Sequence, residues 1–220
     1  LDATVGNEAQ SAGCDRVDYG LSTTATQCSN VAGSPYPILI TLGANPNYSV
    51  KIPATSGALT ITARLASVTA NARTKVYGDP NPALSATVTG EAPAAGCDRI
   101  NYGVGTTAAQ CSNVAGSPYP ITVTLGANPN YSSTVPPTPA PLTITRRPAS
   151  VTARSKTKVY GDPLPALDVT LIGEAAGCDA VVYSVGTSAT QCSGVAGGPH
   201  SLTLTPCANP PPVPPPVDGS

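Results

Sequence analysis

Apolar and polar residues alternate along much of this chain, in short runs separated by turn residues. Residues 84–89 (LSATVT) alternate strictly, and residues 121–125 (ITVTL) form the clearest run of this kind. Successive side chains of a strand point to opposite faces, so such alternation predicts half-buried strands. Helical periodicity is absent throughout. The chain is therefore predicted to be all-β.

The same succession of strands and turns fills the stretch between residues 66 and 147. Further strands are predicted at 67–74, 100–104, 131–135 and 142–145. The Gly-, Asp-, Asn- and Pro-rich segments between them, such as KVYGDPNP and GANPN, are predicted turns. About seven short strands with turn signals every 8–12 residues are typical of an antiparallel β-sandwich of immunoglobulin-like kind.

This pattern occurs three times, and a pair of cysteines 14 residues apart marks each copy. Residues 1–62 and 84–145 match without a gap at about two thirds of their positions. Repetition on this scale predicts a tandem array of small modules. The expected modules are 1–65 (lacking its opening strand), 66–147 and 148–208 (lacking its closing strands), followed by a proline-rich tail at 209–220. The chain is expected to begin and end inside a module. It is then either a fragment of a longer array or a chain whose incomplete sheets are completed by strands of neighbouring chains.

The cores of such modules must lack the bulkiest apolar side chains, because the chain has no Phe, Trp or Met. Disulfides are the usual support for small cores, and they require an oxidising compartment. Identical spacing in each copy predicts local bridges: Cys14–Cys28, Cys97–Cys111 and Cys178–Cys192. Cys207 is then the odd cysteine, expected to bond another chain or a segment beyond this fragment, or otherwise to be a buried inert thiol.

Charge and residue content exclude several functions. A net charge of −1, with only 10% charged residues, gives no basic face for nucleic acid. No apolar run is long enough to insert into a membrane. One histidine and scattered hydroxyls make no catalytic triad, so no enzyme and no cofactor are predicted. Zinc needs clustered Cys and His, and calcium a DxDxDG-type loop, so no metal site is predicted.

An ordered series of motifs resembles the MBG repeat of the YGX type, an Ig-like module found in tandem on large surface proteins. The series runs LTIT, SVTA and KVYGDP (residues 142–163, and earlier 59–80), then GSPYPIT, then a G-x-N-x-N-Y-S segment. The resemblance covers nearly the whole chain and implies the Ig-like fold. The cysteine pairs depart from it.

The C-terminal NPPPVPPPV stretch, expected to form a polyproline II helix, is similar to segments of algal extracellular glycoproteins of mastigoneme type. This resemblance points to an algal lineage and the first to a bacterial one. In a eukaryotic secreted chain, the Asn-Tyr-Ser sequons make Asn47 and Asn130 candidate N-glycosylation sites.

Uniform repeats without distinctive exposed side chains favour a structural role. The chain is expected to be a secreted or cell-surface, non-catalytic segment of a filament or stalk. Its expected partners are further chains of the same assembly, met through sheet edges and proline-rich segments, together with glycans. The alternative is a surface adhesin whose modules bind a glycan or a protein.

Overall fold

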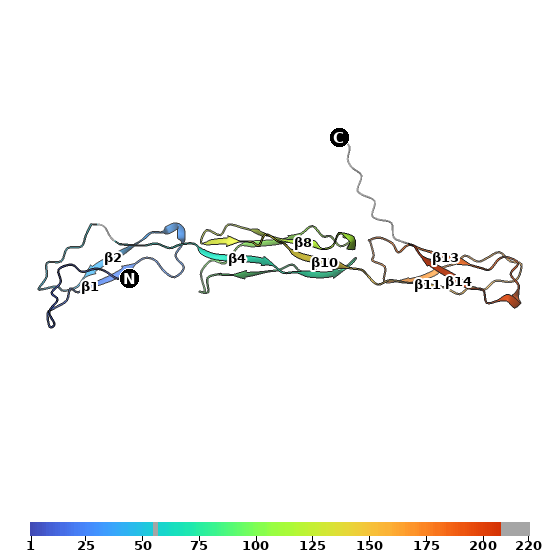
Figure 1. Cartoon of the computed structure of the whole chain (residues 1–220), viewed down its shortest axis with the longest axis horizontal. Coiled ribbons are helices and arrows are strands. Elements are labelled where there is room, and N and C mark those ends of the chain that lie inside the picture. The colour runs from blue at the N-terminus through green and yellow to red at the C-terminus, as the bar shows by residue number, and fades with distance from the viewer. Residues whose placement is uncertain (55–56, 208–220) are drawn as a thin grey trace, which may run out of the picture. The chain divides into compact units, whose positions relative to one another are not determined.

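The computed structural model describes residues 1–54 and 57–207, and this part of the chain is all-β (Figure 1). Its helical elements are the 3-10 turns η1 (Val31–Gly33), η2 (Val114–Gly116) and η3 (Val195–Gly197), one in each sequence repeat, with no α-helix among the described residues. The strands of the first repeat are β1 (Tyr19–Thr23), β2 (Tyr36–Leu42) and β3 (Gly57–Leu59). Those of the second are β4 (Arg64–Ala70), β5 (Arg73–Val76), β6 (Ala86–Thr89), β7 (Tyr102–Thr106), β8 (Tyr119–Leu125), β9 (Tyr131–Thr134) and β10 (Ala140–Thr145). Those of the third are β11 (Ser150–Ala153), β12 (Val169–Ile172), β13 (Tyr183–Thr187) and β14 (Leu202–Pro206).

The chain divides into two compact units, and the second repeat contributes to both. Unit 1 comprises Leu1–Asn71, Leu84–Gly105 and Ile121–Ala140, and unit 2 comprises Ala72–Ala83, Thr106–Pro120 and Pro141–Ser220. The second repeat also holds a four-stranded sheet in the order β5-β10-β8-β7.

Unit 1 holds two three-stranded sheets. The strands β1, β2 and β3 pair antiparallel in that order, with Tyr19 opposite Leu42. In the other sheet, β4 lies between β6, its antiparallel neighbour, and β9, its parallel neighbour. Ala66 and Val68 of β4 alternate with less buried residues and pack with Ile100 and Tyr131 in a buried cluster. Alternation of this kind is what the sequence pattern predicts for a sheet with one buried face.

Unit 2 is built from strand pairs. β5 and β10 pair in parallel, whereas β11 pairs antiparallel with β12, and β13 with β14. Leu142 and Ile144 of β10 are 0% and 2% exposed and supply most of its buried apolar surface. Among the described residues, the buried hydrophobic ones of both units come from the second repeat, except Ala175 of the third. The core of small aliphatic side chains expected from the composition is thus concentrated in the middle repeat.

The strands predicted at 84–89, 100–104, 121–125, 131–135 and 142–145 are confirmed with shifted ends, as β6, β7, β8, β9 and β10. The prediction of one strand over 67–74 is wrong. The chain there forms two strands, β4 and β5, which belong to different sheets. The alternating pattern runs through both, so periodicity alone does not mark the crossing. The predicted polyproline II tail lies outside the described residues.

Candidate functional site: the junctions between successive repeats

Two disulfides link successive sequence repeats: Cys28–Cys97 lies within unit 1, and Cys111–Cys178 lies within unit 2. Cys28 bonds Cys97 with their Cα atoms 4.9 Å apart, and Cys111 bonds Cys178 at 5.4 Å. The second cysteine of one repeat is therefore joined to the first cysteine of the next. The predicted local bridges are wrong in this structure, and Cys14 and Cys192 are exposed and carry free thiols.

The reason lies in the strand between the two cysteines of each repeat. In the second repeat this is β7, five residues long. An extended strand of that length spans about 17 Å. Bonded cysteines need Cα atoms within about 4.4–6.8 Å of each other. Cys97 and Cys111 lie in the loops before and after this strand, and each bonds a cysteine of a neighbouring repeat.

A buried lysine holds the loop of the second cysteine in place. The Nζ of Lys75, which is only 7% exposed, donates hydrogen bonds to the carbonyl oxygens of Asp79 (3.0 Å), Ala109 (2.7 Å) and Gln110 (3.1 Å). The side chain of Gln110 donates in turn to the carbonyl of Gly78 at 2.8 Å. Burial lowers the pKa of Lys75, and the nearby Asp79 carboxylate opposes that shift in part. The KVYGDP turn and the cysteine loop therefore form one rigid surface.

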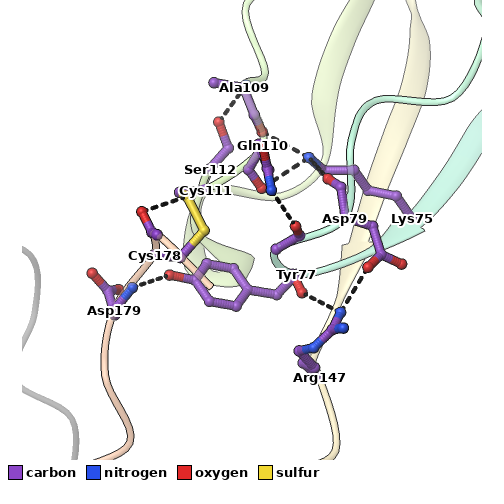
Figure 2. The surroundings of a disulfide bond; sticks show 12 residues. Lys75, Tyr77, Asp79, Ala109, Gln110, Cys111, Ser112, Arg147, Cys178 and Asp179 are labelled. Atoms are coloured by element: carbon purple, nitrogen blue, oxygen red, sulfur yellow. Dashed lines mark hydrogen bonds and ion pairs between the residues drawn. A yellow bond between two sulfur atoms is a disulfide. The ribbon is translucent and has the colours of Figure 1, made fainter. Parts of the chain in front are cut away.

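Figure 2 shows how this surface meets the third repeat around the Cys111–Cys178 bond. The Tyr77 hydroxyl accepts a hydrogen bond from the backbone N–H of Asp179 at 3.0 Å. Burial is the main cause of a raised pKa at Tyr77. Arg147, on the connecting segment, donates to the carbonyl oxygens of Gly173 (3.1 Å) and Tyr77 (3.3 Å) and pairs with the Asp79 carboxylate at 2.7 Å.

The backbones also approach closely at this junction. A Cβ atom added to Gly78 would collide with the side chain of Ala175. Gly78 has φ of +85°, a conformation that other residues rarely adopt. Glycine in the KVYGDP motif therefore serves both the turn and the contact with the next repeat.

The junction of the first and second repeats uses an asparagine in addition to its disulfide. The Nδ2 of Asn130 donates to Asn30 Oδ1 (2.8 Å) and to the Asp98 carboxylate (2.6 Å), and its Oδ1 accepts from the backbone N–H of Val31 (2.9 Å). Arg64 donates to the carbonyl of Gly90 at 2.7 Å, as Arg147 does to Gly173. The disulfide therefore sits among directional polar contacts that fix the two repeats in one register.

The surface around the first cysteine is organised alike in the first two repeats. Tyr131 Oη donates to the Asp98 carbonyl, and Tyr48 Oη donates to the Asp15 carbonyl at 2.6 Å. Glu91 pairs with Arg99, and Glu8 with Arg16, at 2.8 Å in both cases. The pKa values of Glu8 and Glu91 are both lowered, mainly because each carboxylate accepts a backbone N–H, from Val17 and Ile100 respectively.

The remaining predicted site residues lie apart from one another. Asn130 is half-buried in a junction, whereas Asn47 is exposed and contacts Asp15 at 2.5 Å. Cys207 is exposed on the third repeat, where its backbone N–H donates to Val182 and its thiol to Thr205 at 3.9 Å. Across residues 1–54 and 57–207 no group of three or more His, Cys, Asp or Glu is arranged to hold a metal ion. The same residues include no helix able to cross a membrane.

Sequence reasoning missed the side chains that make the junctions. Lys75 and Tyr77 return as Lys158 and Tyr160, and Arg64 returns as Arg147, each the second residue after an LTIT segment. The signal available in the sequence was that these polar residues recur at equivalent positions in the KVYGDP motif and after LTIT.

The comparisons identify one family. The family model of the MBG domain (YGX type) matches residues 66–143. No curated protein and no solved structure matches the chain. The match covers the repeat that holds most of the buried apolar residues and one cysteine of each junction disulfide. The chain therefore carries an MBG domain of the YGX type at residues 66–143.

Proposed function

We propose that this chain is a non-catalytic structural segment of an extracellular filament or cell-surface stalk. In this proposal the three repeats are Ig-like β-sandwiches in a tandem array, and the segment assembles with other chains of the same structure through sheet edges and proline-rich segments. The observation that supports it best is that the disulfides join repeats to one another. Each disulfide is surrounded by hydrogen bonds that also cross from repeat to repeat.

Such junctions suit a chain whose repeats must keep a fixed register. A bridge inside one repeat would restrict that repeat alone and would not fix it relative to its neighbour. Here the covalent bond instead restricts one repeat relative to the next, which is the property a stiff segment needs. Disulfides also suit an oxidising, extracellular location.

An open groove on the third repeat, lined by both polar and apolar side chains, favours the adhesin alternative. About 550 Å³ of open space lies among Lys156, Lys158, Tyr160, Leu164 and His200. Aromatic and hydrogen-bonding side chains around an open groove can bind a glycan or a peptide. The groove belongs to one repeat, whereas the junction chemistry is shared, so the structural role is the better supported.

Immunogold electron microscopy of native material would test the proposal. Antibodies raised against residues 66–143 should label extracellular fibres at regular intervals along their length. Label confined to isolated points on the cell surface would contradict a filament. Binding of the purified chain to a glycan array, abolished by Tyr160→Ala together with Lys158→Ala, would support the adhesin instead.

A further inference from the structure

Two cysteines of this chain belong to the junction series but carry free thiols. Cys14 corresponds to Cys97 and Cys178, which are both bonded as the first cysteine of their repeat. Cys192 corresponds to Cys28 and Cys111, which are both bonded as the second. Every bond in the series joins a second cysteine to a first cysteine. Cys192 and Cys14 are the complementary pair that this rule leaves over.

The surface around Cys192 is built like the one around Cys111. Lys158 donates to the carbonyl oxygens of Asp162 (3.2 Å) and Gln191 (2.8 Å), as Lys75 does to Asp79 and Gln110. The side chain of Gln191 donates to the Gly161 carbonyl at 2.7 Å, which repeats the bond from Gln110 to Gly78. The loop of Cys192 is thus held in the same way as the loop that forms a junction.

At the junctions around Cys28–Cys97 and Cys111–Cys178, certain side chains are partly covered by the next repeat. Their counterparts on the surface around Cys192 are exposed. Tyr160 is 63% exposed, whereas its counterpart Tyr77 is half-buried against Asp179. Val195 is 86% exposed, whereas Val31 and Val114 are half-buried. An apolar patch that its equivalents bury in a junction indicates a surface that binds a further repeat.

The surface around Cys14 supplies the matching half. Asn47 and Tyr48 contact Asp15 as Asn130 and Tyr131 contact Asp98, so the same polar groups stand beside the first cysteine. Asn7 occupies the position of Gly90, the acceptor of Arg64, and has a positive φ of 58° like that glycine. The local backbone of the receiving surface is therefore also preserved.

We propose that two copies of this chain join head to tail, through a disulfide between Cys192 of one copy and Cys14 of the other. The backbone N–H of Asp15 would then donate to the Tyr160 hydroxyl, and Asn47 would accept from the backbone N–H of Val195. Gly194 stands where the first repeat has Asn30, so the joint has one side-chain acceptor fewer than the inner junction.

The bond forms by exchange with a small disulfide oxidant such as oxidised glutathione. The Cys192 thiolate attacks the oxidant, forms a mixed disulfide and releases one thiolate of the oxidant. The Cys14 thiolate of the second copy then attacks the Cys192 sulfur and releases the other. The two protein thiols lose two protons and two electrons in total, and both electrons remain on the reduced oxidant.

Cys207 provides an internal control, because it lies outside the junction series. It takes the position of Gly126, and its contacts are with its own repeat, at Val182 and Thr205. Oxidation without recognition would use any exposed thiol. It would therefore produce Cys14–Cys14, Cys192–Cys192 and Cys207 bonds as well as the proposed one.

The experiment is equilibration of the full chain, produced without N-glycans, in a glutathione redox buffer. Equal amounts of ¹⁴N- and ¹⁵N-labelled chain are mixed, and linked peptides are identified by mass spectrometry. We expect mixed-isotope Cys14–Cys192 peptides in large excess over the other pairs, and a ladder of oligomers on a non-reducing gel. The ladder should persist in Cys207→Ser and collapse to monomer in Cys192→Ser or Cys14→Ser.

A conservative variant separates recognition from simple oxidation. Tyr160→Phe keeps the cysteines and the ring but removes one hydrogen-bond acceptor, so the equilibrium yield should fall about two- to tenfold. Tyr183→Phe, away from this surface, should change nothing. A statistical mixture of linkages, Cys14–Cys192 peptides within one isotope only, or a ladder that depends on Cys207 would each overturn the proposal.

The inference deepens the proposed function, but it can fail separately. Absence of joining between purified copies would leave the labelling of native fibres untouched. Joining without any fibre label would retain the joint and reject the filament.

Discussion

Lys75 shows how one residue fixes a junction. Its ammonium group is almost fully buried, yet it donates to three carbonyl oxygens, which is the full number of its N–H bonds. A depressed pKa means that burial disfavours the charged form in the folded state. This cost falls away only as the pH rises through the folded pKa, so at neutral pH the three hydrogen bonds have to offset it.

Replacing this lysine should destabilise the junction surface. Lys75→Met retains the apolar volume but leaves three carbonyls without their donor, and we expect a loss of about 2 kcal/mol in the free energy of unfolding. Urea denaturation followed by tyrosine fluorescence would measure it. The matched control is Lys158→Met, whose side chain is more exposed and whose carbonyl partners water can reach. An equal effect of the two variants would contradict the importance of burial.

The two sequons should differ in glycosylation because only one amide is engaged across a junction. Asn130 Nδ2 uses both of its hydrogens, on Asn30 and Asp98, whereas Asn47 is exposed. In a eukaryotic secretory host we expect a glycan at Asn47 and little or none at Asn130. Site-resolved glycopeptide mass spectrometry measures this. Cys28→Ser should raise the occupancy at Asn130, and full occupancy in the oxidised wild type would refute the assignment.

A glycan at Asn47 would occupy the amide that the proposed head-to-tail joint uses. Glycosylated chain should therefore join poorly. Ser49→Ala removes the sequon without changing Asn47, and in that host it should restore oligomers on a non-reducing gel. If glycosylated and glycan-free chains join equally well, Asn47 does not lie in the joint.

Acid should weaken the surfaces around the first cysteines. The pKa values of Glu8 and Glu91 are lower in the folded chain than the ordinary value, about 4.3 for an unperturbed glutamate. A depressed carboxyl pKa contributes stability above the unfolded pKa, and that contribution is lost as the pH falls through the folded pKa. Denaturation midpoints should thus be constant near neutral pH and drop below about pH 4. Glu91→Gln should flatten part of that drop.

The strands themselves follow from local sequence, but their connections do not. Alternation of apolar and polar residues placed β6, β8 and β10 because each strand has one buried face. It missed the division between β4 and β5, since the pattern continues while the chain changes sheets. It also could not show which cysteines meet, because the pairing depends on how neighbouring repeats contact each other rather than on sequence spacing.

The disulfides should stabilise the chain more than local bridges would. They close loops with sequence separations of 69 and 67 residues. On the chain-entropy estimate each is worth about 4 kcal/mol, against about 3 kcal/mol for a bridge of 15 residues. The double variant Cys28→Ser/Cys97→Ser should therefore lower the unfolding free energy of unit 1 by roughly that amount. The control variant is Cys14→Ser, which removes a free thiol. A similar loss of stability in this control would show that the local Cys14–Cys28 bridge forms in solution.

At the scale of the whole molecule, the junctions couple neighbouring repeats. In linear repeat proteins, stability is approximately the sum of the repeats' own terms and nearest-neighbour terms. The second repeat has most of the buried apolar residues, so the first and third depend on it. Reduction should turn one cooperative transition into several. Calorimetry would detect this as a van't Hoff enthalpy that falls below the calorimetric enthalpy, and unchanged cooperativity would show that the repeats are independent.

The position of the disulfides also decides how the chain would respond to being pulled at its ends. A force entering at Cys28 passes directly to Cys97, runs through residues 97–111 and crosses to Cys178. The residues between Cys28 and Cys97, and between Cys111 and Cys178, lie outside that path and cannot be extended while the bonds persist. The residues enclosed by each bond have a contour length of about 240 Å, at about 3.5 Å per residue, which cannot be extended while the bond persists. Reduction would release it in two steps, so the redox state of the surroundings would set the chain's reach.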